Sequence, residues 1–259
     1  MKKILFCDMD GTIINESGLL YSNDKEMIEK YREAGNIFVF NTGRNIEEAK
    51  SEINKHDLSY DYLVLNNGAQ IIDKDDTILY KRVIMKEVGI KIIEECLKYD
   101  NLWVYFFAGK TTLAYYQGQT YKFSSQGMVI SKEYDFLKEY PKVIEFAIIT
   151  IHQDDQQLDT VLKIQQFVAK NYYDDAQGTL NQHYLDITPS NCTKGTGITD
   201  LVNLIGEDLT SYGIGDSYND ISMFKHADYA YTFNRVNDEI KKYSFEQVDN
   251  LSELIEKIL

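Results

Sequence analysis

Two aspartates with a single residue between them follow the first apolar stretch of the chain. The stretch is Ile4-Leu5-Phe6-Cys7, and it runs into Asp8-Met9-Asp10-Gly11-Thr12. If the chain stays extended, the side chains of Asp8 and Asp10 point the same way, and Gly11 permits a tight turn directly after them. Two neighbouring carboxylates repel each other, and a divalent cation is the natural compensation. Because Mg²⁺ prefers oxygen ligands and usually shares them with a substrate phosphate, this segment predicts metal-assisted chemistry on a phosphate.

A solvated turn and a calcium-binding loop are the alternatives for this segment. Aspartate and glycine are common turn residues, so a solvated turn stays open when the segment is taken alone. An EF-hand loop requires glycine at position six and glutamate at position twelve. Counting from Asp8, Gly11 is fourth and Leu19 is twelfth, and an apolar strand precedes the segment instead of a helix. We therefore exclude the calcium loop.

A second candidate segment, Asn41-Thr42-Gly43-Arg44, follows the apolar stretch Ile37-Phe38-Val39-Phe40 and precedes a predicted helix. A threonine hydroxyl and exposed backbone N–H groups at the start of a helix can cradle a phosphate. The sequence Asn-Thr-Gly is also common in ordinary loops, so this segment decides nothing by itself.

A lysine and a group of polar residues in the last third of the chain complete the candidates. Lys194 opens a predicted helix over 195–205, where the helix dipole already supplies positive charge. A cation in that position suggests neutralisation of a phosphate, although a solvated surface lysine is equally compatible. Asp216, Asn219 and Asp220 follow another apolar strand. One of these three can cap the next helix, and that does not exclude metal binding.

The elements that must position these residues follow two patterns. At the start of the chain, apolar strands alternate with amphipathic helices, which predicts a parallel sheet with crossover helices. The predicted strands are 3–8, 37–40 and 62–65, and the predicted helices are 24–34, capped by Asn23 or Asp24, and 46–56. The alternation resumes near residue 188, with helices over 195–205, 219–226 and 252–259 and strands over 212–215 and 229–232.

Paired strands replace this alternation in the middle of the chain and favour an antiparallel sheet. The predicted strands there are 70–73, 77–81, 103–107, 113–116, 145–151 and 184–187, with helices over 86–99 and 158–170. We therefore predict an α/β protein with a discontinuous domain, residues 1–82 and 188–259. An α+β domain, residues 83–187, is inserted into it. Paired hinges over 80–84 and 185–190, the second stiffened by Pro189, would allow the inserted domain to close.

The composition narrows the classes of partner. The chain has 259 residues, a formal net charge of −14 and a pI near 4.7, so bulk electrostatics argue against binding to nucleic acid. Three widely spaced cysteines argue against a disulfide scaffold or a zinc knuckle. No stretch approaches the roughly 20 apolar residues that span a bilayer. We expect a cytoplasmic protein that binds no membrane and is a monomer or weak homodimer.

The four candidate segments together resemble the motifs of the haloacid dehalogenase superfamily. They are Asp-Met-Asp-Gly-Thr at 8–12, Asn-Thr-Gly-Arg at 41–44, Thr-Lys-Gly at 193–195 and Gly-Asp-Ser-Tyr-Asn-Asp at 215–220. Their order, and the long insert between the second and third, is most similar to the Cof-type phosphatase branch. The resemblance implies a Rossmann-like core with a parallel sheet and an inserted cap domain of type II, subclass B.

The resemblance also implies roles for particular residues. Asp8 would be the nucleophile and form an aspartyl-phosphate, and Asp10 would be the general acid and then the general base. Mg²⁺ would be held by Asp8, Asp216 and the backbone carbonyl of Asp10. Phosphate would be bound by Thr42, Lys194, Asn219 and the backbone of Met9 and Gly43, and Asp220 would orient Lys194 or a water on the metal.

These roles predict a phosphatase for small phosphorylated metabolites, with sugar phosphates as the expected class. Asp10 favours phosphate over carbon–halogen chemistry, because the dehalogenases of this superfamily lack the second aspartate. One alternative is a phosphomutase, which would need several basic residues in the cap, whereas the cap has scattered lysines and Arg82 at its edge. The other alternative is a non-catalytic ligand-binding or regulatory protein. The cap is rich in aromatic residues, which could stack on a sugar ring or simply pack within the domain.

Overall fold

The computed structural model describes residues 2–15, 17–21 and 23–259, and these residues form two compact units. The first unit comprises Met1–Arg44, Glu52–Lys81 and Cys192–Leu259, and the second comprises Asn45–Ser51 and Arg82–Asn191. Met1, which belongs to the predicted first domain, lies outside the described residues together with Glu16 and Ser22. Pro189 ends a strand of the second unit, and the predicted hinges remain predictions.

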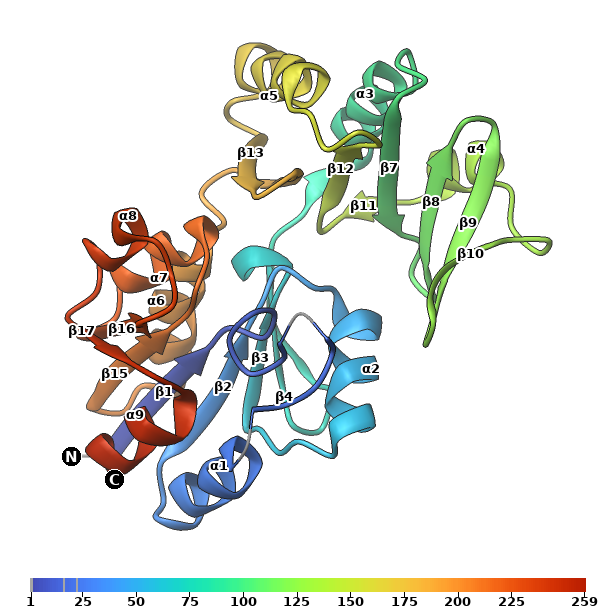
Figure 1. The fold of residues 1–259 in the computed structure, drawn as a ribbon. Helices are drawn as coiled ribbons and strands as arrows, with labels where there is room; N and C mark the ends of the chain where they lie inside the picture. Colours follow the sequence, from blue (N-terminus) through green and yellow to red (C-terminus); the bar gives the residue numbers. More distant parts are fainter. Residues whose placement is uncertain (1, 16, 22) are drawn as a thin grey trace. The chain divides into compact units, whose positions relative to one another are not determined.

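In the described part of the first unit, one sheet carries the strand order β17-β16-β15-β1-β2-β3-β4-β5 (Figure 1). The strands from β17 to β3 are parallel, and β4 and β5 form the antiparallel hairpin at one edge. Central strands are apolar on both faces, as expected for a parallel sheet covered by helices. The bounds are β1 Lys2–Cys7, β2 Ile37–Asn41, β3 Tyr62–Leu65, β4 Gln70–Asp73, β5 Ile78–Lys81, β15 Leu209–Ile214, β16 Tyr229–Phe233 and β17 Glu246–Val248.

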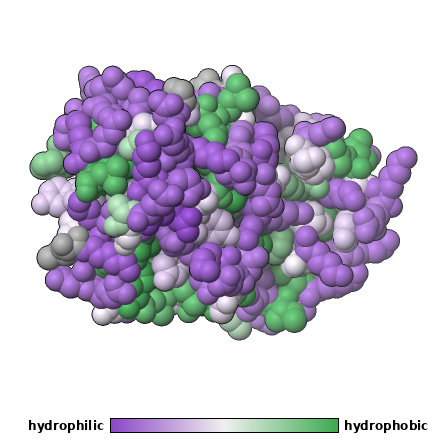
Figure 2. All heavy atoms as spheres, turned by 90° about the horizontal axis from the view of Figure 1, so that it is seen from below, coloured by the Kyte–Doolittle hydropathy of each residue, from purple (hydrophilic) through white to green (hydrophobic). Residues whose placement is uncertain are grey.

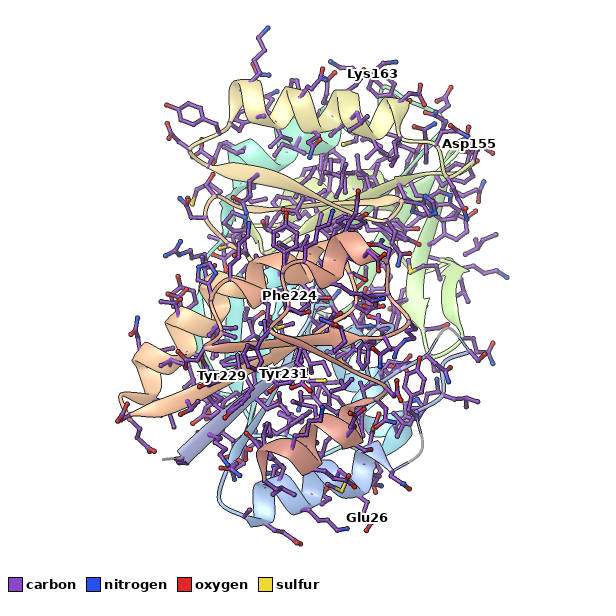
Figure 3. All side chains as sticks on the ribbon, turned by 60° about the vertical axis from the view of Figure 1, so that its left-hand side comes forward. Glu26, Asp155, Lys163, Phe224, Tyr229 and Tyr231 are labelled. Atoms are coloured by element: carbon purple, nitrogen blue, oxygen red, sulfur yellow. The ribbon has the colours of Figure 1, made fainter. Side chains whose placement is uncertain are left out.

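Helices follow most of the parallel strands and bury one apolar face each. Phe224 of α7 illustrates this packing, since its side chain is buried in one apolar cluster with Ala230 of β16 (Figure 3). The bounds are α1 Asp24–Glu33, α2 Ile46–His56, of which residues 46–51 belong to the second unit, α6 Lys194–Ile205, α7 Ile221–Phe224, α8 Asp238–Lys241 and α9 Leu251–Ile258, with short 3₁₀ turns η1 Asn66–Gly68 and η3 Tyr218–Asp220.

The predicted side-chain cap of the first helix is wrong. Asn23 stands at the N-cap with φ +72° and its side chain makes no capping hydrogen bond. Asp24 is buried and its Oδ1 accepts hydrogen bonds from the backbone N of Ser252 at 2.9 Å and from Ser252 Oγ at 2.5 Å. The aspartate therefore joins α1 to α9, a partner that no local pattern in the sequence could reveal.

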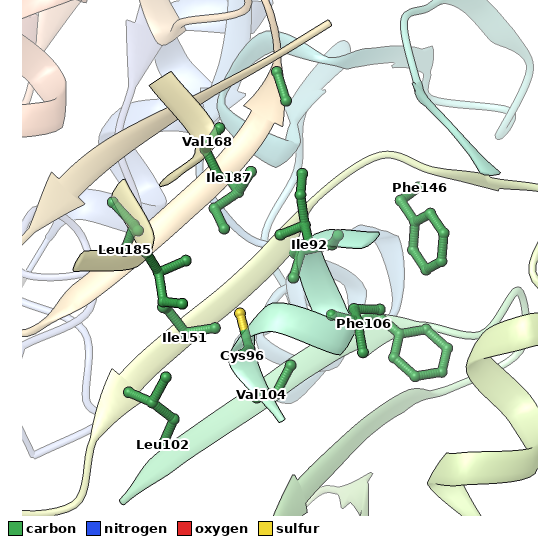
Figure 4. Packing of buried hydrophobic residues seen from close by; sticks show 14 of the residues in the cluster. Ile92, Cys96, Leu102, Val104, Phe106, Phe146, Ile151, Val168, Leu185 and Ile187 are labelled. Atoms are coloured by element: carbon green, nitrogen blue, oxygen red, sulfur yellow. The ribbon is translucent and has the colours of Figure 1, made fainter. Parts of the chain in front are cut away.

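The second unit contains an antiparallel sheet with the order β10-β9-β8-β7-β12-β14-β13 and a separate pair, β11 and β6. Strand β7 alternates buried and half-buried residues, so one face of the sheet packs against helices. Figure 4 shows this apolar layer, including Val104, Phe106, Ile151 and Ile187. The bounds are β6 Ile84–Met85, α3 Lys86–Cys96, β7 Leu102–Phe107, β8 Thr112–Tyr116, β9 Gln119–Ser124, β10 Gly127–Ile130, α4 Phe136–Glu139, η2 Tyr140–Lys142, β11 Glu145–Phe146, β12 Ile149–Gln153, α5 Asp159–Asn171, β13 Ala176–Asn181 and β14 Tyr184–Pro189.

The predicted single strand over 145–151 is wrong, because two strands occupy this region. β11 pairs with β6, whereas β12 lies in the large sheet between β7 and β14. The sequence contains one apolar run here, and nothing in that run indicates that the chain changes from one partner strand to another. Strands β9 and β13 escaped the sequence analysis because they are polar or half-exposed and show no continuous apolar stretch, and β10 escaped it because its apolar run is only three residues long.

Hydrophilic side chains dominate the face of the molecule drawn in Figure 2, where the green apolar atoms form separate small patches. Among the described residues, no helix has the length and apolar character needed to cross a membrane.

Candidate active site

Three neighbouring parallel strands bring the candidate residues together at their carboxyl ends. Cys7, the last residue of β1, is paired with Phe40 of β2 and Ile214 of β15. The next residue, Asp8, donates its backbone N–H to the Ile214 carbonyl at 3.0 Å. Asp8 therefore stands between the segments that begin with Thr42 and Asp216. This is the edge of an open parallel sheet where ligands bind.

Lys194 lies at the centre of this edge and is only 1% exposed. Its Nζ donates to Asp8 Oδ1 at 2.5 Å and to Asp220 Oδ1 at 2.6 Å. Burial alone would lower the pKa of the ammonium, but the charges of Asp220 and Asp8 outweigh this effect and raise its pKa. Lys194 is therefore a buried, permanently charged group, and the solvated surface position considered from the sequence is excluded.

The first turn of α6 holds this lysine in place. Thr193 is the N-cap, and its side chain accepts from the backbone of Thr196 while the Thr196 hydroxyl accepts from the backbone N of Thr193 at 2.9 Å. Asn41 adds a second anchor, since its Nδ2 donates to the Lys194 carbonyl at 2.9 Å. A capped and anchored turn fixes the direction in which the ammonium points.

Asp8, Asp216 and Asp220 form a cluster in which one oxygen of each lies within 4.8 Å of the others. Burial, and then the charge of Asp220, raises the pKa of Asp216 to about 6. Burial is also the largest cause of the raised pKa of Asp8. Three carboxylates share one ammonium here, so the cluster carries excess negative charge that a divalent cation would neutralise.

The hydrogen bonds within this cluster divide its members into two kinds. Asp220 uses Oδ1 for Lys194 and Oδ2 for the backbone N–H groups of Asp216 at 3.0 Å and Ser217 at 2.9 Å. Asp8 and Asp216 each keep one carboxylate oxygen to which no donor of the described residues is assigned. Those two oxygens suit a metal ion, and Asp220 suits the support of Lys194.

Gly11 lies directly against the carboxylate of Asp216 in the acid cluster. Its φ is +76°, and a Cβ atom built on it would lie 2.0 Å from Asp216 Oδ2. Only glycine allows both this backbone conformation and this contact. Gly11 of the first motif is thus required because the Asp216 carboxylate of the fourth motif leaves no room for a side chain.

Asp10 stands apart from the three clustered carboxylates. Its side chain is 55% exposed and forms a two-pronged ion pair with Arg44, Nε to Oδ2 at 2.8 Å and Nη2 to Oδ1 at 2.7 Å. Burial pulls the pKa of Asp10 upward, but the hydrogen bonds and charge of Arg44 outweigh it and lower the pKa. In this arrangement the Asp10 side chain is an anion held by Arg44, and the third carboxylate of the cluster is that of Asp220.

Arg44 received no role from the sequence, although it ends the second motif. The signal was its position directly after Thr-Gly at the end of a strand parallel to β1. A guanidinium there can reach a carboxylate on the neighbouring strand end and bind it with two hydrogen bonds.

The remaining predicted residues line the same edge. Thr42 is buried, and its hydroxyl oxygen accepts from the backbone N of Arg44 at 3.2 Å. Asn219 is buried and its Nδ2 is 3.5 Å from Asn67 Oδ1, while its own Oδ1 lacks a partner within the described part of the chain. An unpaired buried amide oxygen beside the acid cluster is unfavourable unless a ligand or water completes it. Met9 lies in the segment that follows β1, and Gly43 lies in the segment that follows β2.

Asn67 is a further polar residue that the sequence analysis left without a role. It follows β3 and has φ +51°, in a turn that also holds Asn66 and Gly68 at positive φ. The Asn-Asn-Gly sequence after an apolar strand was the available signal, since asparagine and glycine tolerate this conformation best.

The second unit carries a ladder of aromatic rings on the sheet face opposite its apolar layer. The Trp103 ring lies 4.4 Å from Tyr116 with a 7° angle between planes, and 5.9 Å from His152 with a 5° angle. Tyr105 and Tyr184 extend the ladder. Burial lowers the pKa of His152 to about 4, so its ring is neutral at pH 7.

A family model described as haloacid dehalogenase-like hydrolase matches residues 5–253. The chain therefore belongs to that family, and the family predicted from the four motifs is confirmed.

Individual relatives agree with this assignment. A Bacillus subtilis (strain 168) protein named 5-amino-6-(5-phospho-D-ribitylamino)uracil phosphatase is 24% identical over 264 residues, covering 93% of this chain and 91% of that protein. A solved haloacid dehalogenase-like hydrolase from Bacteroides thetaiotaomicron is 21% identical with a TM-score of 0.77 over 100% of both chains. A solved sugar phosphatase of subclass IIB is 20% identical with a TM-score of 0.77 over 99% of both chains. These likenesses confirm the predicted fold class.

Proposed function

We propose that this hydrolase is a Mg²⁺-dependent phosphatase that cleaves small phosphorylated metabolites through an aspartyl-phosphate on Asp8. The observation that carries the proposal is the buried contact of Lys194 with both Asp8 and Asp220, beside Asp216. A permanently charged ammonium at 2.5 Å from a carboxylate holds that carboxylate in one orientation. The same ammonium neutralises part of the negative charge of an approaching phosphate. Phosphoryl transfer depends mainly on such positioning and neutralisation.

In the first step, the carboxylate oxygen of Asp8 beside Lys194 attacks the phosphorus atom, and the other oxygen of Asp8 stays available to a metal ion. The bond from phosphorus to the ester oxygen breaks, and Asp10 gives a proton to that departing oxygen. In the second step, Asp10 takes a proton from a water whose oxygen attacks the phosphorus and releases Asp8 and inorganic phosphate. Since Arg44 favours the anionic form of Asp10, the acid step requires that the ion pair loosens when substrate binds.

Asp8, Asp216 and the backbone carbonyl of Asp10 are the groups proposed to hold Mg²⁺. When bound, the ion would neutralise charge on the phosphate and on the nucleophile. The excess negative charge of the acid cluster and its two oxygens without assigned donors support this choice.

Phosphate oxygens would be bound by Lys194, by the Thr42 hydroxyl and by the Asn219 side chain, with backbone N–H groups of Met9 and Gly43. The burial of Thr42 and Asn219 supports these roles, because buried donors bind an anion without competition from water.

The substrate class rests on the comparisons and on the charge of the chain. The named relative acts on a phosphorylated ribityl compound and one structural neighbour is a sugar phosphatase. A sugar or polyol phosphate is therefore the expected substrate. The net charge of −14 disfavours large polyanions.

The test is hydrolysis of p-nitrophenyl phosphate with and without added Mg²⁺. We expect activity that EDTA abolishes, and a loss of at least about 10³-fold in kcat for Asp8→Asn, since an amide cannot replace the nucleophile. Asp57→Asn is the matched control, because Asp57 is a surface acid that forms an ion pair with Lys25. Equal rates for wild type and Asp8→Asn would refute the proposal. Isomerised hexose phosphate without free phosphate would identify a mutase instead.

A further inference from the structure

Arg235 lies beside the first motif, although the mechanism above does not use it. It follows β16, and its guanidinium carbon is 3.7 Å from the centre of the Phe233 ring and 4.9 Å from that of Tyr21. Its Nη2 donates to the Gly11 carbonyl, and its Nη1 is 3.4 Å from the Asp249 carbonyl. Two rings and two carbonyls thus hold a cation that reaches back 224 residues to the segment carrying Asp10.

The Gly11 peptide is held from several directions. Its N–H donates to the Ile14 carbonyl at 2.7 Å, and its Cα faces the Asp216 carboxylate. The backbone N–H groups of Ile13 and Ile14 both donate to the Met9 carbonyl, at 3.1 and 2.9 Å. The loop after β1 is therefore a closed turn whose outward carbonyl, that of Gly11, is completed by Arg235.

We propose that Arg235 is a positioning residue that fixes the loop carrying Asp10. By binding the Gly11 carbonyl and packing on Tyr21, it sets the direction of the preceding residue, Asp10, and the distance of Gly11 from Asp216. It touches none of the reacting atoms. Its kinetic consequence rests on the phosphatase function proposed above, whereas its effect on loop order does not.

A role of Arg235 through charge and a role through geometry predict different results for its replacement by lysine. A role through charge alone would be kept by lysine, whereas the planar guanidinium both stacks on Phe233 and donates in the direction of Gly11, which lysine cannot reproduce. Arg235→Lys therefore separates the two explanations, and Arg235→Ala removes both. Lys225→Ala is the matched control. Lys225 is also a surface cation over an aromatic ring, 5.1 Å from the centre of Tyr243, and among the described residues it makes no hydrogen bond or ion pair with the loop.

The kinetic experiment measures kcat and KM for p-nitrophenyl phosphate at saturating Mg²⁺. We expect kcat to fall roughly tenfold or more in Arg235→Lys and Arg235→Ala, with KM changed less than about twofold, because misplacement of a catalytic group costs rate more than binding. Lys225→Ala should match wild type. Full kcat in Arg235→Lys would overturn the positioning role, and so would a rise in KM without a fall in kcat.

Hydrogen exchange gives a readout that does not depend on activity. The amides of Gly11, Ile13 and Ile14 should exchange about tenfold faster in Arg235→Ala than in wild type or Lys225→Ala, while the amides of β1 and β2 keep their protection. Retained protection in those strands shows that the variant is folded. Unchanged exchange at residues 11–14 would overturn the inference even if wild type is an active phosphatase. Inactive wild type with faster exchange in the variant would refute only the phosphatase function.

Discussion

The sheet edge that holds Lys194 and the aromatic sheet face that holds Trp103 are held together by different kinds of interaction. At the sheet edge of the first unit, Lys194 is a buried charged group, and the carboxylates of Asp8 and Asp220 hold it. In the second unit, an alternating strand places apolar residues on one face and aromatic rings such as Trp103 on the other. The first arrangement depends on a few exact distances, whereas the second depends on contact area. Substitutions in the two units should therefore have different effects on activity and stability.

The largest expected effect is that of Lys194→Met. Methionine fills similar volume but leaves the Asp8 and Asp220 carboxylates facing each other without a cation. Because removing one partner of a buried ion pair strands the other, we expect a loss of roughly 3–5 kcal/mol in the free energy of unfolding. Activity should fall at least about 10³-fold. Urea denaturation and p-nitrophenyl phosphate turnover measure the two effects, with Lys225→Met as control. A variant as stable as wild type would mean that the ammonium is not paired as described.

Phe106→Ala should destabilise the second unit without touching the acid cluster. Phe106 is buried among Phe136 and Phe146 in the apolar layer, with ring centres 5.0 and 5.9 Å away. Truncation leaves a cavity and costs about 3–5 kcal/mol. Thermal unfolding measured separately for each unit by hydrogen exchange should show the loss in β7, β12 and β14 first. Equal losses in β1 and β2 would show that the units unfold together.

Arg44→Gln tests whether the ion pair on Asp10 matters for rate. Glutamine can donate to one carboxylate oxygen but cannot provide two parallel bonds or a charge. We expect kcat to fall roughly 10- to 100-fold, with Mg²⁺ activation and stability close to wild type. Steady-state kinetics across Mg²⁺ concentrations provide the measurement. Arg32→Gln, which breaks a comparable pair with Asp61 away from the site, is the control. An unchanged kcat would remove Arg44 from the proposed proton transfer.

His152 should give the smallest effect, a pH dependence confined to the second unit. Burial lowers its folded-state pKa to about 4 from an ordinary value of 6.5. Protonation is thus harder in the folded state, so stability is full above pH 6.5 and falls as the pH drops toward 4. Because the ring is partly solvated, we expect a loss of only about 1 kcal/mol. His152→Phe should flatten the dependence between pH 6.5 and 4. A dependence that survives His152→Phe would come from another group.

Much of the first unit was predictable from the sequence because its signals are local. Apolar strands followed by Asp8, Thr42 and Asp216 revealed both the parallel sheet and the segments at its edge. Three contacts were not predictable: the ion pair of Arg44, the contact of Gly11 with Asp216 and the hydrogen bonds from Ser252 to Asp24. Each joins residues distant in the chain through side-chain geometry, which leaves no periodic pattern. In the second unit, polar strands such as β13 were missed for the related reason that their stability comes from neighbours.

The insertion of residues 82–191 into the first unit has a consequence for how the protein is made. Strand β1 gains β2 as a neighbour early in synthesis, but β15, its other neighbour, is translated about two hundred residues later. Residues 82–191 leave the ribosome in between and contain a complete apolar layer of their own. Domains fold as they emerge, so this insert can fold before the unit around it. Its folding shortens the loop that the two ends must close, and β1 pairs with β15 only after residues 209–214 have been made.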